Sequence, residues 1–180
     1  EISDLLPKKI EKVSPINLDI ESPVENGKTF EENSEIKANF FCEKSNLVTY
    51  FFEYRLSPEH NFPAAHEDAK IAIEFIDNLH KDEQSIWIGE SAGGGLATGL
   101  VVDDGFVYNP DNLILLSPWL DLSDGFQDKR FLKNRDVTII IEGMFEVGEF
   151  YAGEYGTTNP ILSPVYACLL YTSDAADDWS

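Results

Sequence analysis

A five-residue segment, Gly89-Glu90-Ser91-Ala92-Gly93, constrains the fold of this chain most because of what lies on either side of it. The residues before it, Ser85 to Gly89 (SIWIG), form a short apolar run that predicts a buried strand. The residues after it, Ala92 to Leu100, are small or apolar and predict a helix. A serine at such a strand-to-helix junction lies in a sharp, strained turn that exposes its hydroxyl group. The sequence therefore predicts a nucleophile at Ser91.

The neighbours of Ser91 fit the same prediction. We expect the small residues around it to be required because a Cβ there would collide with the neighbouring strand or helix. The N–H of Ala92, at the helix N-terminus, can donate a hydrogen bond to the oxyanion of a tetrahedral intermediate. The predicted turn, called the nucleophile elbow below, comprises Gly89, Glu90, Ser91, Ala92, Gly93 and Gly94.

These glycines also occur in two other kinds of loop. An ordinary glycine-rich turn is possible for any isolated G-x-S-x-G, but the flanking strand and helix favour the elbow. A dinucleotide-binding loop fits poorly, since Gly93 to Thr98 (GGGLAT) does not complete the G-x-G-x-x-G pattern. No acidic residue follows on a next strand at the expected distance. Gly95 and Gly99 have the spacing for close helix packing.

The rest of the chain alternates apolar runs with amphipathic segments. Further strands are expected at Leu47–Tyr54 and Leu113–Leu116, and further helices from Asn33 or Ser34 to about Lys44, at Ala64–Leu79 and at Val137–Tyr151. Buried strands that alternate with helices over short connections are typical of an α/β protein whose mostly parallel sheet has helices on both faces. In that class the reactive groups lie in loops at the carboxyl ends of the strands.

Charge and composition exclude several classes of partner. The 180 residues include 13 Lys and Arg against 33 Asp and Glu, a formal charge of −20. Such a surface repels nucleic acid and anionic lipid, so we expect neither nucleic acid nor a membrane surface as a partner. No apolar run approaches a membrane span and no signal pattern is visible, so we expect a soluble, cytoplasmic protein. Cys42 and Cys168 are expected to be two buried free thiols, and no metal site or cofactor is predicted.

Three motifs in order carry a resemblance to a known family. Gly89 to Ala97 (GESAGGGLA) is preceded by Tyr54 to Ala65 (YRLSPEHNFPAA) and followed by Ser117 to Leu122 (SPWLDL). Together they resemble the hormone-sensitive-lipase-like branch of the α/β-hydrolases, over roughly residues 32 to 168.

The resemblance implies a serine carboxylesterase that acts on short-chain acyl or similar small esters, with Ser91 as nucleophile and the Ala92 amide as one oxyanion donor. It implies structural roles for Arg55, Glu59 and Asp68, which would join the loop to the following helix. Trp119 and Asp121 would lie near the pocket, where packing is at least as well supported as substrate contact.

The sequence departs from the family in two places. The His-Gly-Gly segment that supplies further oxyanion donors is missing, because Gly27-Lys28-Thr29-Phe30 runs directly into Glu31. In this fold the triad follows the chain order Ser, then acid, then His. Here all three histidines, His60, His66 and His80, precede Ser91. The triad Asp and His are therefore not present in this chain.

These departures predict an inactive fragment of an esterase. We expect residues 1–31 to form an N-terminal, cap-like segment and first strand region, 32–168 a partial hydrolase core with part of a helical cap, incomplete at its C-terminal end, and 169–180 a non-native tail. One alternative is a non-catalytic homologue that binds a small ligand and lacks the triad His, like the plant gibberellin receptors. Hydrolysis of other acyl bonds, such as amides, also remains open.

Overall fold

The computed structural model describes residues 26–81, 83–123 and 141–167. The chain forms two compact units. Of the described residues, those up to Glu53 belong to the smaller unit and those from Tyr54 onward belong to the larger. The predicted elbow lies entirely in the larger unit.

The described residues of the smaller unit, 26–53, include one long helix, α2 (Phe30–Ser45). The Thr29 hydroxyl accepts a hydrogen bond from the Glu32 N–H over 3.2 Å, which satisfies one of the unpaired donors at the helix start. Asn46 ends the helix in the left-handed conformation (φ 55°), and its N–H donates to the Cys42 carbonyl. The predicted helix is confirmed, but it begins at Phe30 rather than at Asn33 or Ser34 because Thr29 supplies the cap.

Two predictions for the smaller unit are wrong. The buried strand predicted at Leu47–Tyr54 does not form. These residues are irregular, and Leu47, Val48 and Phe51 are exposed. A strand needs a neighbouring strand to satisfy its backbone, and among the described residues only β1 and β2 pair, with each other. Cys42, expected to be buried, is free and exposed near the end of α2. Cys168 lies outside the described residues.

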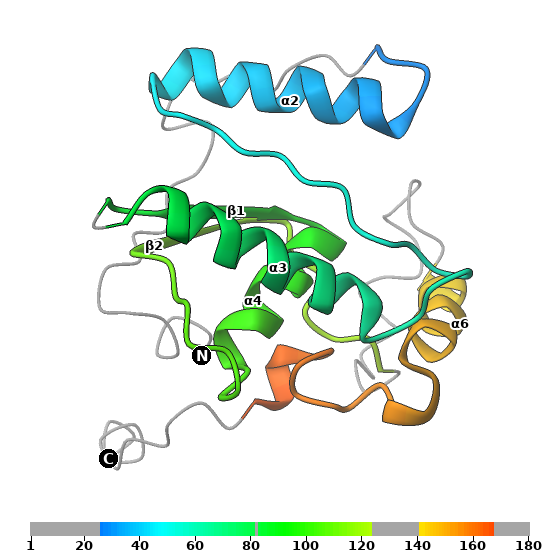
Figure 1. Cartoon of the computed structure of the whole chain (residues 1–180). Coiled ribbons are helices and arrows are strands. Elements are labelled where there is room, and N and C mark those ends of the chain that lie inside the picture. The colour runs from blue at the N-terminus through cyan, green and yellow to red at the C-terminus, as the bar shows by residue number, and fades with distance from the viewer. Residues whose placement is uncertain (1–25, 82, 124–140, 168–180) are drawn as a thin grey trace, which may run out of the picture. The chain divides into compact units, whose positions relative to one another are not determined.

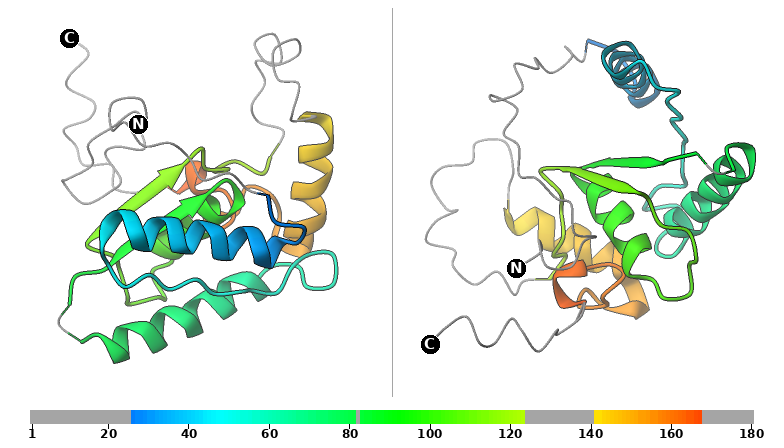
Figure 2. Two further views of the ribbon diagram at one scale, coloured as in Figure 1. Left: turned by 90° about the horizontal axis from the view of Figure 1, so that it is seen from above. Right: turned by 90° about the vertical axis from the view of Figure 1, so that its left-hand side faces the viewer.

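In the larger unit, two strands pair in parallel, β1 (Ile86–Glu90) and β2 (Asn112–Leu116). The register places Ile88 opposite Ile114. Helix α4 (Ala92–Val102) lies across one face of this pair, and α3 (Ala64–Leu79) lies beside α4 (Figures 1 and 2). The order strand, helix, strand with parallel pairing is the arrangement that the sequence predicts.

The two faces of the strand pair differ in exposure. Side chains alternate along a strand, so Trp87, Gly89 and Leu115 face α4 and are buried or half-buried. Ile86, Ile88 and Ile114 point the other way and are exposed. Within the described part of the larger unit, helical cover is therefore seen on one face of β1 and β2.

A second packed region follows β2. Helix α6 (Ile141–Ala152) continues into the 3-10 turn η2 (Gly153–Tyr155), and a second turn, η3 (Pro164–Tyr166), follows. A small core forms from Leu122, Ala152 and Leu162, with Phe62, Trp119 and Tyr151 packed against it. The helix predicted at Val137–Tyr151 is confirmed from Ile141, since residues 137–140 are not described.

Candidate active site

Ser91 lies between the end of β1 and the start of α4, and its backbone has φ 51° and ψ −118°. Residues with a side chain rarely adopt this conformation, so the backbone of Ser91 is strained. The residue is exposed, and none of the hydrogen bonds among the described residues uses its Oγ. The hydroxyl group is thus held at a sharp turn and is open to solvent.

The backbone of Ser91 is fixed on both sides. Its N–H donates to the Leu116 carbonyl over 3.0 Å. Its carbonyl accepts from the N–H groups of Gly94 at 3.0 Å, Gly95 at 3.2 Å and Trp119 at 2.8 Å. Neighbouring chain segments therefore satisfy both polar backbone groups, which keeps the strained conformation in place.

Glycines allow the close approach of strand and helix. A Cβ on Gly89 would lie 2.5 Å from the carbonyl oxygen of Gly93, and one on Gly94 would lie 2.6 Å from Cβ of Pro118. The expected steric need for small residues therefore holds at these two positions. The predicted collision is wrong for Gly93. An added Cβ there would meet no heavy atom within 4 Å, because that face of the helix is open. Glu90 ends β1 and is exposed.

Gly95 and Gly99 also make close contacts, but with carbonyl groups of loops. A Cβ on Gly95 would lie 2.4 Å from the Trp119 carbonyl oxygen, and one on Gly99 would lie 2.2 Å from that of Ile161. The expectation of close packing holds, and a helical neighbour appears only at Gly99, where His66 of α3 approaches.

Ala92 is the first residue of α4. The N–H groups of the first turn of a helix have no intrahelical acceptor and carry the positive end of the helix dipole. The amides of Gly94 and Gly95 donate to the Ser91 carbonyl. Those of Ala92 and Gly93 come earlier in the same turn, beside Ser91. The Ala92 N–H thus lies at the start of the helix, where anions bind favourably, and its role as an oxyanion donor stays a prediction.

His66 is buried in the packing between α3 and α4. Its Nε2 lies beside Gly99, at 2.8 Å from the position of an added Cβ. Gly99 follows Ser91 by eight residues, so His66 is about 12 Å from Ser91 along the helix axis. Neither ring nitrogen has a hydrogen-bond partner of good geometry among the described residues. Burial lowers the pKa of His66 to about 4, against an opposing effect of the nearby Ile161 carbonyl.

The other two histidines lie on either side of α3. His80 follows α3, and its Nδ1 lies 3.3 Å from the Glu83 carboxylate. Glu83 precedes β1, a strand about 16 Å long that ends at Glu90, immediately before Ser91. His60 is exposed in the turn before α3. Among the described residues, no histidine makes a hydrogen bond with Ser91.

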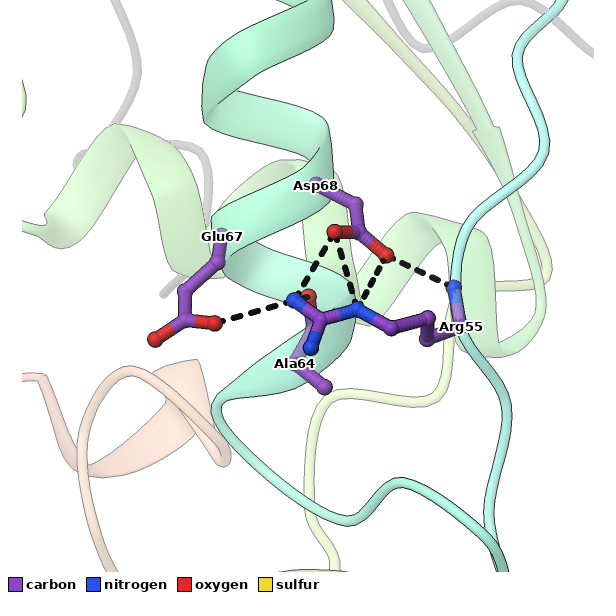
Figure 3. Close-up of polar contacts among 4 residues, drawn as sticks. All are labelled: Arg55, Ala64, Glu67 and Asp68. Carbon is purple, nitrogen blue, oxygen red and sulfur yellow. Dashed lines mark hydrogen bonds and ion pairs between the residues drawn. The ribbon is translucent and has the colours of Figure 1, made fainter.

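Arg55 joins the loop before α3 to the first turns of that helix (Figure 3). Its Nε lies 3.0 and 2.9 Å from the two carboxylate oxygens of Asp68, and its Nη2 lies 2.9 Å from Glu67. The backbone N–H of Arg55 also donates to Asp68 over 2.8 Å. Hydrogen bonds from Arg55 lower the pKa of Asp68. The structural roles of Arg55 and Asp68 are as expected, but the second carboxylate is Glu67, because Glu59 lies in the exposed turn.

Trp119 and Asp121 serve the packing of the segment after β2. The indole N–H of Trp119 donates to the Asp121 carbonyl over 2.7 Å. The Asp121 carboxylate accepts from both the N–H and the hydroxyl of Ser123, at 2.9 and 2.6 Å. Ser163, fully buried, accepts from the Leu122 N–H over 2.8 Å and so ties this segment to the turn before η3.

Sequence reasoning missed two residues of this region. Ser163 is central to the packing, and only its place before Pro164 marked it in the sequence. Ser117 has a positive φ of 44°, although it is not glycine. No sequence signal indicates that conformation.

Neither a metal centre nor a membrane span is found in the part of the chain that the structure describes. There, no cluster of three or more His, Cys, Asp or Glu side chains could bind a metal ion. No helix in the same residues is both long and apolar enough to cross a bilayer.

Comparison with known proteins identifies the family. Residues 32–176 match the model of a family with the alpha/beta hydrolase fold. An acetyl-hydrolase of Streptomyces hygroscopicus is 29% identical over 119 residues, which are 64% of this chain and 40% of that protein. Human arylacetamide deacetylase-like 2 is 30% identical over 117 residues, 56% of this chain and 29% of that protein.

Solved structures agree with the sequence matches. The crystal structure of EstE7, a hormone-sensitive-lipase homologue from a metagenome library, is 36% identical with a TM-score of 0.58. The match covers 64% of this chain and 41% of EstE7, so the chain spans about two fifths of the relative's length. The chain belongs to the α/β-hydrolase fold family, within its hormone-sensitive-lipase-like branch of esterases.

Proposed function

We propose that this chain carries the nucleophile of a serine carboxylesterase that acts on short-chain acyl esters, and that Ser91 is that nucleophile. The observation that carries the proposal is the strained backbone of Ser91, whose exposed hydroxyl stands at the N-terminus of α4. Strain of this kind persists only where the surrounding structure maintains it, and it is concentrated at functional sites. The acetyl-hydrolase and esterase names of the relatives support ester hydrolysis as the reaction.

In the proposed reaction, Oγ of Ser91 attacks the carbonyl carbon of the ester, and the carbonyl oxygen becomes an oxyanion. The Ala92 N–H donates to that oxyanion. The carbon–oxygen bond to the alcohol then breaks, and the proton lost by Ser91 leaves with the alcohol. Water attacks the resulting acyl-Ser91, which releases the carboxylic acid and restores the serine hydroxyl.

The attack requires a base, because a serine hydroxyl is a weak nucleophile near neutral pH. His66 is buried and about 12 Å along α4 from the nucleophile, so it cannot accept this proton. No histidine follows His80 in the sequence. We therefore expect this chain to acylate slowly and to gain rate when a base is supplied from solution.

The experiment is hydrolysis of p-nitrophenyl acetate by the purified chain, with and without added imidazole. Ser91→Ala removes the proposed nucleophile and also measures the hydrolysis that imidazole causes by itself. Ser45→Ala, which changes the exposed serine at the last position of α2, is the matched control. We expect the parent and Ser45→Ala to show a Ser91-dependent release of p-nitrophenol that rises with imidazole concentration.

Equal rates for the parent and Ser91→Ala at every imidazole concentration would contradict the proposal. Ser91 would then be a structural residue of the turn, and the ligand-binding alternative would gain weight. A Ser91-dependent rate that does not respond to imidazole would contradict only the proposed lack of a base.

A further inference from the structure

We propose that Ser117 positions the nucleophile, through a left-handed turn of its backbone that lets one short segment hold both polar backbone groups of Ser91. The inference rests on the proposed role of Ser91. It concerns the residue that maintains the reactive geometry and not the reaction itself.

The end of β2 and the segment that follows it make two backbone hydrogen bonds with Ser91. The Leu116 carbonyl, at the end of β2, accepts from the Ser91 N–H over 3.0 Å. The Trp119 N–H, three residues later, donates to the Ser91 carbonyl over 2.8 Å. A parallel strand that continued past Leu116 would present the second residue on, Pro118, to the Ser91 carbonyl, but proline has no N–H to donate, so the chain must shift to bring the Trp119 N–H there instead.

Ser117 makes that shift possible. Its φ of 44° lies in the left-handed region, which few residues other than glycine adopt. An extended residue at this position would continue β2, in which successive residues direct their N–H groups to opposite sides, so the Trp119 N–H would point away from the elbow. The turn also places Pro118 against α4, where its Cβ lies 2.6 Å from the position of a Cβ on Gly94.

The side chain of Ser117 contributes little to this arrangement. The residue is exposed, and its hydroxyl takes part in none of the hydrogen bonds among the described residues. The structural requirement is thus for a backbone angle and not for a hydroxyl group. This separates a positioning role from side-chain chemistry, because residues that tolerate positive φ should replace serine without loss.

The test is a series of substitutions at position 117. Ser117→Gly and Ser117→Asn tolerate the left-handed conformation, whereas Ser117→Val disfavours it strongly and Ser117→Ala disfavours it less. Asn46→Val is the matched control, since Asn46 has a φ of 55° at the end of α2 and belongs to the smaller unit. This substitution introduces the same backbone conflict in the unit that does not contain the elbow.

Two readouts are measured on the 180-residue chain. The first is the rate at which a fluorophosphonate modifies Ser91, where Oγ bonds to phosphorus and fluoride leaves with the hydroxyl proton. The second is hydrogen exchange of the Trp119 amide, followed by NMR. We expect Ser117→Val to reduce the modification rate roughly tenfold and to lose protection at Trp119, with a smaller change for Ser117→Ala. Ser117→Gly, Ser117→Asn and Asn46→Val should stay within about twofold of the parent.

The outcomes separate this inference from the proposed function. Unchanged labelling and unchanged Trp119 protection in Ser117→Val, or in Ser117→Ala if the valine variant does not fold, would overturn the inference. Equal losses in Ser117→Gly and Ser117→Val would also overturn it, because the hydroxyl would then matter. If the parent does not react at Ser91, the proposed function fails, and exchange at Trp119 still decides the positioning role.

Discussion

The start and the middle of α4 both depend on glycine for close packing, but polar groups are exposed at the start and buried in the middle. At the start, Gly89 and Gly94 let the strand, the helix and Pro118 come within contact distance. The result is a strained serine whose hydroxyl is exposed and whose neighbouring N–H groups face a possible ligand. The close packing here serves to present polar groups to solvent.

In the middle of α4, Gly99 allows equally close contact with a different result. A Cβ there would lie 2.2 Å from the Ile161 carbonyl oxygen and 2.8 Å from Nε2 of His66. The imidazole that packs there is only 4% exposed and has a lowered pKa. The comparison shows that one helix can expose a serine hydroxyl at its start and enclose a histidine ring farther along, where burial lowers the pKa of that ring.

The largest expected effect comes from adding one carbon atom at Gly99. Gly99→Ala forces the Ile161 backbone or the His66 ring to move, so the free energy of unfolding should fall by about 3 kcal/mol or more. Gly93→Ala is the control in the same helix, since its Cβ meets no atom within 4 Å, and it should change stability by less than about 1 kcal/mol. Urea denaturation measures both. Equal values for the two variants would contradict the contrast between these positions.

The next effect is a pH dependence that belongs to His66. Its folded pKa of about 4 lies below the ordinary value of 6.5, so the unfolded chain binds more protons between these pH values. The stability of the fold should therefore be unaffected by His66 above about pH 6.5 and should fall by roughly 3 kcal/mol as the pH approaches 4.

His66→Leu should remove this acid-dependent loss while keeping an apolar side chain in the packing. His60→Leu changes an exposed histidine and should keep the loss. The measurement is the free energy of unfolding of each protein at several values between pH 4 and pH 7. An identical pH dependence in the parent and His66→Leu would show that this histidine is not buried in its neutral form.

The smallest of these effects is the release of strain at Ser91. Ser91→Gly removes the Cβ that makes φ 51° unfavourable, at the cost of a more flexible unfolded chain. The balance should raise the free energy of unfolding by roughly 1 kcal/mol. Ser91→Ala keeps the Cβ and should not stabilise the protein. A stabilisation of the same size in both variants would mean that the hydroxyl, and not the backbone angle, carries the cost.

The sequence predicts some of these features better than others. Helix α3 was predicted with its observed bounds, Ala64–Leu79, because its apolar residues recur at helical spacing after Pro63. The elbow was found because G-x-S-x-G stands between an apolar run and small residues. Both signals are local, so a single sequence contains them.

The failures concern features that depend on distant residues. Residues 47–54 have the composition of a strand, but composition does not indicate whether a partner strand pairs with them. The burial of His66 depends on Gly99 and Ile161, which are 33 and 95 residues away in the sequence. The positive φ of Ser117 accompanies the hydrogen bonds that Leu116 and Trp119, on either side of it, make with Ser91, and serine gives no sign of it.

The most direct test of the central claim is to find where a fluorophosphonate reacts with the chain. After incubation and proteolysis, mass spectrometry identifies each modified residue. We expect Ser91 to be modified selectively, to a greater extent than the exposed Ser45 and Ser117, and we expect no such adduct in Ser91→Ala. Modification spread evenly over exposed serines, or an unmodified Ser91 beside a modified Ser45, would contradict the claim that this turn presents a nucleophile.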